Sequence, residues 1–179
     1  NVTQIDEFTP TSLFVDSFDL QSSNWLWSGG QTVPFTLGSD KVVKSEGTGD
    51  WSSNFHRSAY SLDNGERVEV RFQLNQSSVE SVSAIESSDG TSRFGLYVVN
   101  EEFKLQYKNG GSWHYLLLPQ EVTADEWYSL EIALDDQDGF FLTLCAEESS
   151  VNQCVSQRVS MGAGKAWRFR HWIKTGTAY

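Results

Sequence analysis

The stretch from Arg93 to Cys145 constrains the fold of this chain more than any other. It reads RFGLYVVNEEFKLQYKNGGSWHYLLLPQEVTADEWYSLEIALDDQDGFFLTLC, with apolar runs separated by Asn-Glu-Glu, Asn-Gly-Gly, Thr-Ala-Asp-Glu and Asp-Gln-Asp-Gly. An apolar–polar alternation with a period of two indicates strands, and polar groups rich in Asn, Asp and Gly indicate the turns between them. The stretch therefore predicts an antiparallel meander.

The same alternation occurs on both sides of this meander. In ERVEVRFQLN, residues 66–75, apolar side chains take every second position, and in WRFRHWIK, residues 167–174, cationic and aromatic residues form the outward set. Two more strands are expected within 32–46 and one at 13–19, whereas no window has a convincing helical stripe. About a dozen short strands with frequent turns predict an all-β fold, a two-sheet antiparallel sandwich of the jelly-roll type.

Length and charge limit the organisation and the partners. The 179 residues suit one domain, so we expect a leader over 1–12 and a single sandwich over 13–179. The chain ends directly after a strand-like run, which predicts a module excised from a larger protein with other domains. No apolar run approaches the roughly 20 residues of a membrane span. A net charge of −11 disfavours nucleic acid, because a negative field repels a polyanion.

Cys145 and Cys154 are the two cysteines of the chain, and a polar loop, AEESSVNQ, separates two strand-like runs that contain them. A hairpin at this place would bring the two sulfur atoms together. We therefore expect a disulfide and an oxidising, extracellular or cell-surface location, with two unpaired thiols as the alternative. Two cysteines without a neighbouring His pair make only half of a zinc site.

The strand pattern resembles the concanavalin A-like lectin/glucanase superfamily, which includes lectins, laminin-G-like domains, family 16 glucanases and carbohydrate-binding modules. The residues that carry the resemblance are FVDSFD near the start, RVEVRFQL, RFGLYVV, FKLQY, DEWYSLEI at 125–132, DGFFLTL at 138–144 and the closing GTAY. They cover most of the chain as a pattern of strands without a signature motif. The resemblance implies a jelly roll and a glycan-related function.

The acidic residues do not predict hydrolysis. A retaining glucanase of the superfamily has the pattern E-x-D-x-x-E, which places acidic groups on one strand face roughly 5 Å apart. Here no Asp lies between Glu80 and Glu86, and none lies between Glu126 and Glu131, which are five residues apart. The three histidines lie near no recognisable nucleophile turn. We therefore expect that the chain is not an enzyme.

Two groups of residues are candidates for binding a glycan, which needs planar rings and a few polar side chains. The first group is aromatic and lies in polar surroundings: Trp25, Trp27, Trp51, Trp113, His114 and Tyr115. The alternative is that some of these rings cap the ends of the sandwich. The second group is the outward set of alternating strands: Arg71, Arg93, Tyr97, Arg168, Arg170 and Trp172.

If the strands of the second group share a sheet, its outer face carries four guanidinium groups beside two rings. Arginine binds carboxylate or sulfate through two hydrogen bonds, so such a face would suit an acidic polysaccharide. The alternative is cross-strand pairing of these arginines with Glu69 and Glu131 on a solvated sheet.

The resemblance also implies a structural calcium ion near the N-terminal strand, where Asp16 and Asp19 lie in the matching place. The usual acidic partner would follow GTAY, beyond Tyr179. A second set of oxygens, Asp135, Asp136 and Asp138, is better explained as a hairpin turn.

The hypothesis that these observations favour is a non-catalytic carbohydrate-binding module of a secreted or cell-surface protein. A laminin-G-like adhesion or spacer domain that acts through protein contacts is the alternative, and a glycan-active enzyme with an unrecognised site is the third.

Overall fold

The structure is a computed structural model, and it describes residues 25–28, 32–37, 40–51, 55–58, 61–135, 139–147, 153–161 and 166–179. Within these ranges the regular structure consists of strands, and no helix occurs. The expected leader and the strand expected at 13–19 lie outside the described residues, as do Asp16 and Asp19.

The described strands follow the alternating runs of the sequence. Their bounds are β1 (Trp25–Ser28), β2 (Thr32–Leu37), β3 (Asp40–Glu46), β4 (Phe55–Ser58), β5 (Arg67–Gln73), β6 (Glu80–Ser87), β7 (Arg93–Val99), β8 (Glu102–Asn109), β9 (Ser112–Glu121), β10 (Trp127–Leu134), β11 (Gly139–Ala146), β12 (Gln153–Ser160), β13 (Trp167–Thr175) and β14 (Thr177–Ala178). The meander comprises β7 to β11. Its third strand continues to Glu121, three residues beyond the apolar run that ends at Leu118.

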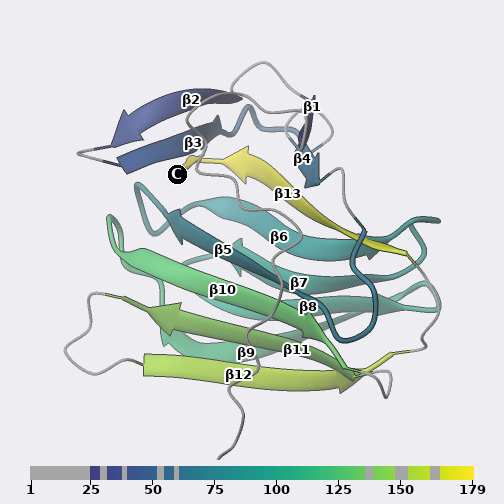
Figure 1. The fold of residues 1–179 in the computed structure, drawn as a ribbon. Helices are drawn as coiled ribbons and strands as arrows, with labels where there is room; N and C mark the ends of the chain where they lie inside the picture. The colour runs from purple at the N-terminus through teal and green to yellow at the C-terminus, as the bar shows by residue number, and fades with distance from the viewer. Residues whose placement is uncertain are drawn as a thin grey trace, which may run out of the picture.

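The strands form two facing sheets and a small third one (Figure 1). The first sheet has seven strands in the order β1-β4-β13-β6-β7-β8-β9, and the second has four in the order β12-β11-β10-β5. A three-stranded sheet, β14-β3-β2, completes the described part. The strand pairings within these sheets are antiparallel, which confirms the predicted antiparallel jelly-roll sandwich.

The meander divides between the two sheets, with β7, β8 and β9 in one and β10 and β11 in the other. Two of its turns follow from their residues. Asn100 and Glu101 join β7 to β8 with φ angles of 53° and 62°, and Gly110 and Gly111 join β8 to β9 with φ angles of 59° and 96°. Two-residue hairpins favour positive φ at both positions, which Asn and Gly adopt readily.

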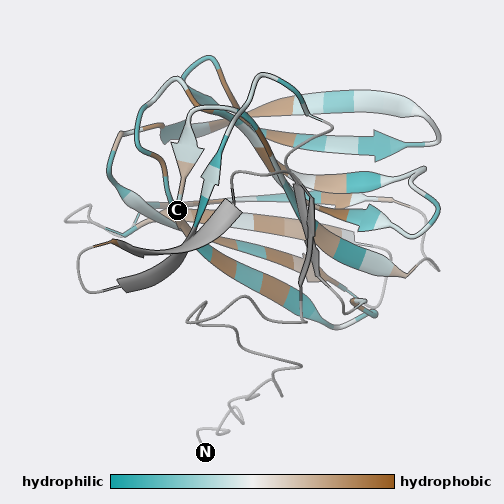
Figure 2. Cartoon of the chain, turned by 90° about the horizontal axis from the view of Figure 1, so that it is seen from above, coloured by the Kyte–Doolittle hydropathy of each residue, from teal (hydrophilic) through white to brown (hydrophobic). Residues whose placement is uncertain are grey.

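The core lies between the seven-stranded and four-stranded sheets and is built from every second residue of each strand. Hydrophobic and hydrophilic positions alternate along the strands in Figure 2. Fully buried side chains include Phe94 and Phe103 from one sheet and Tyr128 and Leu142 from the other. Burial of each such side chain contributes about 1.5–3 kcal/mol. The Tyr128 hydroxyl also accepts from the backbone N–H of Thr123 at 2.8 Å, so its polar end is satisfied.

Cys145 on β11 lies directly opposite Cys154 on β12, and the two form a disulfide, as the sequence predicted. It joins the edge strand of the four-stranded sheet to its neighbour. An edge strand has hydrogen-bonded neighbours on one side only, so a covalent link limits its fraying.

Candidate functional site

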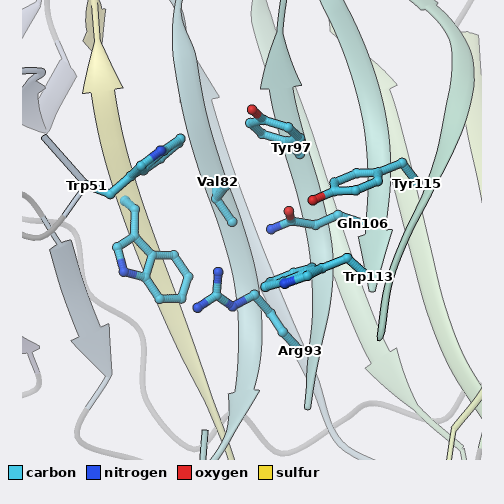
Figure 3. A pocket seen from close by; sticks show the side chains of 8 residues that line it. Trp51, Val82, Arg93, Tyr97, Gln106, Trp113 and Tyr115 are labelled. Carbon is cyan, nitrogen blue, oxygen red and sulfur yellow. The ribbon is translucent and has the colours of Figure 1, made fainter. Parts of the chain in front are cut away.

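A groove of about 240 Å³ lies on the outer face of the seven-stranded sheet, the face turned away from the four-stranded sheet. Figure 3 shows aromatic rings around it and polar ends that point toward its centre. Its lining residues are Trp51, Val82, Arg93, Tyr97, Gln106, Trp113, Tyr115 and Trp172. Seven of them come from β6, β7, β8, β9 and β13, and Trp51 comes from the segment after β3.

The strand register arranges this face in rows that cross the strands. The middle row is Arg170, Ala84, Gly95, Gln106 and Tyr115, taken from β13, β6, β7, β8 and β9 in turn. One flanking row is Trp172, Val82, Tyr97, Lys104 and Leu117, and the other is Arg168, Glu86, Arg93, Lys108 and Trp113. The flanking rows are four residues apart along each strand, roughly 13 Å.

Two small residues of the middle row, Ala84 and Gly95, do not project from the sheet as the large side chains around them do. Ala84 is fully buried, and Gly95 beside it has no side chain. A Cβ atom added at Gly95 would collide with the backbone of Ser83 and Ala84, so the neighbouring strand lies too close for any larger residue. The groove is therefore a short trough at Ala84 and Gly95, with Arg170 at one end of the row and Gln106 and Tyr115 at the other.

The rings of the groove differ in exposure. Trp113 and Tyr115 are 41% and 50% exposed, and their planes are nearly parallel, with 14° between them and 6.3 Å between centroids. Trp172 is only 7% exposed and packs with Val82 and Ala84 in a small apolar cluster separate from the main core. The buried Trp172 ring packs against the sheet at one side of the groove, whereas the exposed rings offer flat faces to a ligand.

Arg93 is the cation of the groove. Its guanidinium lies over the Trp172 ring at 4.1 Å and within 5.1 Å of the Trp113 ring, and its Nη2 donates to Glu86 Oε1 at 2.8 Å. Burial lowers the pKa of this guanidinium from its ordinary value, and the nearby Tyr115 opposes the shift. A partly desolvated cation attracts an anion more strongly than one in bulk water.

Glu86 pairs with two arginines. Besides Arg93, it accepts from Nη1 of Arg170, whose guanidinium also lies 4.7 Å from the Trp172 ring centroid. Glu86 is 8% exposed, so this cluster is well shielded from water. The alternative pairing with Glu69 and Glu131 is wrong for Arg93 and Arg170, because those carboxylates lie on the four-stranded sheet, where Arg67 pairs with both.

Tyr97 closes the other side of the trough. Its hydroxyl donates to Glu80 Oε1 at 2.9 Å, and Lys174 pairs with the other oxygen of Glu80 at 2.9 Å. The pKa of Tyr97 is raised to about 12, mainly because the phenol is buried and secondly because it donates a hydrogen bond to Glu80. The phenol therefore stays neutral at physiological pH and keeps its proton.

Two polar atoms at the groove have no hydrogen-bond partner among the described residues. They are Nε2 of Gln106 and Nε of Arg93, and both are N–H donors. Gln106 is 3% exposed, and its amide end points into the group of lining side chains in Figure 3. A buried donor without an acceptor costs about 1–3 kcal/mol, so each is a position where an acceptor atom would be favourable.

The structure brings together most of the residues predicted from the sequence. Trp51, Arg93, Tyr97, Trp113 and Trp172 all line the one groove. Arg168 and Arg170 lie on the same face of β13 without lining the groove, and Nε of Arg168 donates to Ser61 Oγ at 3.3 Å. The side chains of Trp25 and Trp27 on β1 lie outside the described part of the molecule.

Two of the predicted residues are elsewhere. Arg71 is on β5 in the four-stranded sheet, where it pairs with Glu147 at 2.7 Å and lies 4.0 Å from the Trp127 ring centroid. The expectation that it shares a sheet with Arg93 is therefore wrong. His114 is on β9, but it stacks on Tyr107, which packs against the main core, so it faces away from the groove.

Val82 and Gln106 were missed as groove residues. The alternation around Lys104 and Lys108 does place Gln106 on the outer face, but an isolated glutamine between two lysines looks like a solvated position. Its burial follows from Tyr115, its direct partner across β8 and β9. Cross-strand partners of this kind are a tertiary property.

Metal-binding clusters are not found in the described part of the chain, where no three His, Cys, Asp or Glu side chains come together. Asp135 accepts from the backbone N–H of Gly139 at 2.5 Å and pairs with Arg158 at 3.1 Å. These contacts match the predicted turn role of this residue. The calcium site predicted at Asp16 and Asp19 stays a prediction.

His171 lies on the inner face of β13, outside the groove. Its Nδ1 is 2.9 Å from Ser83 Oγ, and burial lowers the pKa of the imidazole to about 4, against an ordinary value of 6.5. Between about pH 4 and 6.5, the folded protein therefore keeps this imidazole neutral, whereas the unfolded chain would bind a proton there.

We expect the free energy of unfolding to fall by on the order of 2 kcal/mol as the pH is lowered from about 6.5 toward 4. The stabilising contribution is complete above the unfolded pKa and is lost as the pH falls toward the folded pKa. Urea unfolding at intervals of pH measures this slope, and between pH 6.5 and 5 few carboxyl groups titrate. The variant His171→Gln should flatten the slope in that interval, and an unchanged slope would contradict the assignment to His171.

The described residues contain no helix that is long and apolar enough to span a membrane.

Comparison with known proteins gives matches of structure only. No protein-family model matches the sequence, and no curated protein matches it. A solved structure named as an immunostimulatory antigen and pseudo β-1,3-glucanase of Mycobacterium tuberculosis has a TM-score of 0.57 and 11% identity, covering 93% of this chain and 87% of that one.

Two other solved structures are similar to a comparable extent. A glycosyl hydrolase family protein from Mycobacterium fortuitum has a TM-score of 0.56 and 16% identity, covering 94% of this chain and 89% of that one. A carbohydrate esterase from the Shiga toxin-encoding bacteriophage phi24B has a TM-score of 0.57 and 16% identity. The match covers 87% of this chain and 86% of that one. At these identities the likeness shows the fold alone, a jelly-roll sandwich.

Proposed function

We propose that this chain is a non-catalytic carbohydrate-binding module and that it holds an acidic polysaccharide in the groove on the outer face of the seven-stranded sheet. The observation that carries the proposal is the composition of the groove, five aromatic rings beside one guanidinium, one amide and one valine.

This composition suits a sugar better than a purely apolar ligand. The exposed, nearly parallel rings of Trp113 and Tyr115 can stack on the faces of pyranose rings, and Arg93 and Gln106 can donate hydrogen bonds to their oxygens. The absence of large side chains at Ala84 and Gly95 leaves space for a sugar ring between the flanking rows. The names of three structural neighbours, a pseudo-glucanase, a glycosyl hydrolase family protein and a carbohydrate esterase, are in keeping with a glycan ligand.

The acidic residues on this face support a non-catalytic role. None of the eight lining residues is a carboxylic acid, whereas glycoside hydrolysis needs two carboxyl groups that flank the scissile bond. Glu80 and Glu86 are six residues apart on β6, roughly 20 Å, which is beyond the separation of about 5–9.5 Å that either mechanism requires. Both are also engaged by cations, Glu80 by Lys174 and Glu86 by Arg93.

The charge of the face supports an acidic ligand. On the outer face of the described strands β6, β7, β8, β9 and β13, the basic residues are Arg93, Lys104, Lys108, Arg168, Arg170 and Lys174, and the acidic ones are Glu80, Glu86, Glu102 and Glu121. Six basic and four acidic side chains give this face a formal excess of two positive charges in a chain of net −11. Such an excess attracts an anionic polymer.

The disulfide supports a secreted or cell-surface setting, since such bonds persist in oxidising compartments. Protein-contact adhesion is the second candidate, and one observation favours it. The edge strand β9 exposes Leu116 by 43% and Leu117 by 61%, and exposed apolar side chains on an edge strand suit contact with another protein.

A glycan array that includes acidic and neutral polysaccharides, with and without a calcium chelator, tests the proposal. We expect binding to acidic glycans that weakens as the salt concentration rises, because screening reduces attraction between exposed charges. Loss of binding with chelator would support the calcium site proposed at Asp16 and Asp19. Binding to no glycan in either condition would reject the module function and favour the adhesion candidate.

A further inference from the structure

We infer that the groove recognises the carboxylate of a uronic acid, and that Gln106 is the residue that distinguishes the acidic sugar from its neutral counterpart. This inference rests on the proposed glycan function and names the chemical group that the groove binds.

The first step is the position of two donors. Gln106 lies opposite Gly95 on the neighbouring strand, and Arg93 is two residues from Gly95, so Gln106 and Arg93 are diagonal neighbours on one face. Diagonal neighbours are about 7–8 Å apart, within reach of a common point for two long side chains. No side chain stands at Gly95 to separate them.

The second step is the lack of an acceptor. Neither Nε2 of Gln106 nor Nε of Arg93 has a hydrogen-bond partner among the described residues. The Gln106 side chain is almost completely buried, so water does not solvate its amide well either. Trp113 and Tyr115, which line the same groove, are 41% and 50% exposed, so the groove is open to solvent beside this buried amide.

The third step is the kind of acceptor. Two N–H donors from adjacent strands match the two coplanar oxygens of a carboxylate, and a charged acceptor roughly doubles the strength of each hydrogen bond. The positive excess of the face favours a negative group over a neutral carbonyl or hydroxyl. The aromatic rings beside the donors suit a carboxylate that is carried by a ring-shaped ligand, as in a uronic acid.

The fourth step separates recognition from support of the fold. A glutamine that served only the fold would be expected to satisfy its amide within the protein, as most buried polar groups do. Replacing Gln106 with leucine removes the donor and keeps a similar volume, so the variant Gln106→Leu should fold at least as stably as wild type. A loss of acidic-sugar binding in a protein that keeps its stability would then reflect recognition.

Isothermal titration calorimetry with matched probes tests the inference. The probes are hexamers of glucuronate, galacturonate and mannuronate, the same hexamers with their carboxyl groups reduced to alcohols, and a sulfated neutral hexamer. We expect wild type to bind at least one uronate hexamer at least about tenfold more tightly than its reduced form. The variant Gln106→Leu should lose most of that difference in affinity, because a carboxylate loses more from the missing donor than a neutral hydroxyl does.

A matched control is Gln120→Leu, since Gln120 on β9 also has a buried atom without a partner among the described residues but does not line the groove. This variant should keep the wild-type ratio. Circular dichroism of each variant confirms folding, and the comparison of acidic with reduced hexamers in wild type decides the uronate assignment even if Gln106→Leu misfolds.

The outcomes separate the two claims. Equal binding of uronate and reduced hexamers would overturn the inference and leave the glycan function standing, and so would tighter binding of the sulfated hexamer. If folded Gln106→Leu kept the wild-type ratio of uronate affinity to reduced-hexamer affinity, the role of Gln106 would be overturned. Binding of no hexamer by wild type, together with no binding on the glycan array, would reject the glycan function itself.

Discussion

The variant Glu86→Ala is expected to lose about 2–4 kcal/mol of its free energy of unfolding. Glu86 is 8% exposed and is the carboxylate that pairs with both Arg93 and Arg170, whose side chains are 22% and 21% exposed. Without it, the guanidinium of Arg93 keeps its charge in a poorly hydrated site and loses the carboxylate that balances it. Urea unfolding at pH 7 measures the loss.

A matched control for this prediction is Glu69→Ala. Glu69 also pairs with an arginine on a strand, Arg67 at 2.9 Å, but its side chain is 62% exposed and that of Arg67 44%. Exposed ion pairs contribute about 0–1 kcal/mol, so the control should change stability little. If the two variants were destabilised equally, the shielded cluster around Glu86 would not have the importance that its burial indicates.

The variant Trp113→Ala is expected to weaken glycan binding by about tenfold or more, which corresponds to about 1.4 kcal/mol or more. Trp113 is 41% exposed, lies next to the Arg93 guanidinium and stacks with Tyr115 at the groove, so its removal takes away a flat face for a sugar ring. Its exposure predicts that the stability of the variant stays within about 1 kcal/mol of wild type. Titration with the glycan that wild type binds measures the change in affinity.

The control for Trp113→Ala is Trp127→Ala. Trp127 is a partly exposed tryptophan beside an arginine, Arg71, but it belongs to the four-stranded sheet. Its replacement should leave glycan affinity unchanged. Equal losses in the two variants would indicate a nonspecific effect of removing a surface indole, and an unchanged affinity in Trp113→Ala would place the binding surface elsewhere.

The strands and their faces could be predicted closely from the sequence. The alternation assigned Phe94, Leu96 and Val98 to the core and Arg93 and Tyr97 to the outer face, and the burial of each residue agrees. Such assignments depend on the geometry of one strand, in which successive side chains point to opposite faces. The turn residues Asn100, Gly110 and Gly111 likewise specify hairpins through their local φ angles.

The grouping of outward residues was predicted less well, because it depends on which strands become neighbours. Arg71 and Arg93 have the same local pattern, yet β5 joins the four-stranded sheet and β7 the seven-stranded one. His114 was grouped with its chain neighbours Trp113 and Tyr115, although alternation places it on the opposite face of β9.

The sequence by itself determined that the chain forms antiparallel strands, which face of each strand is apolar, and that two cysteines meet across a hairpin. These properties arise from interactions between residues close together in the chain. The tertiary structure decided that Ala84, Gly95 and Gln106 form one row, and that Glu86 pairs with two arginines from different strands. The groove exists because long-range strand pairing places small residues from adjacent strands side by side, and no local pattern specifies that order.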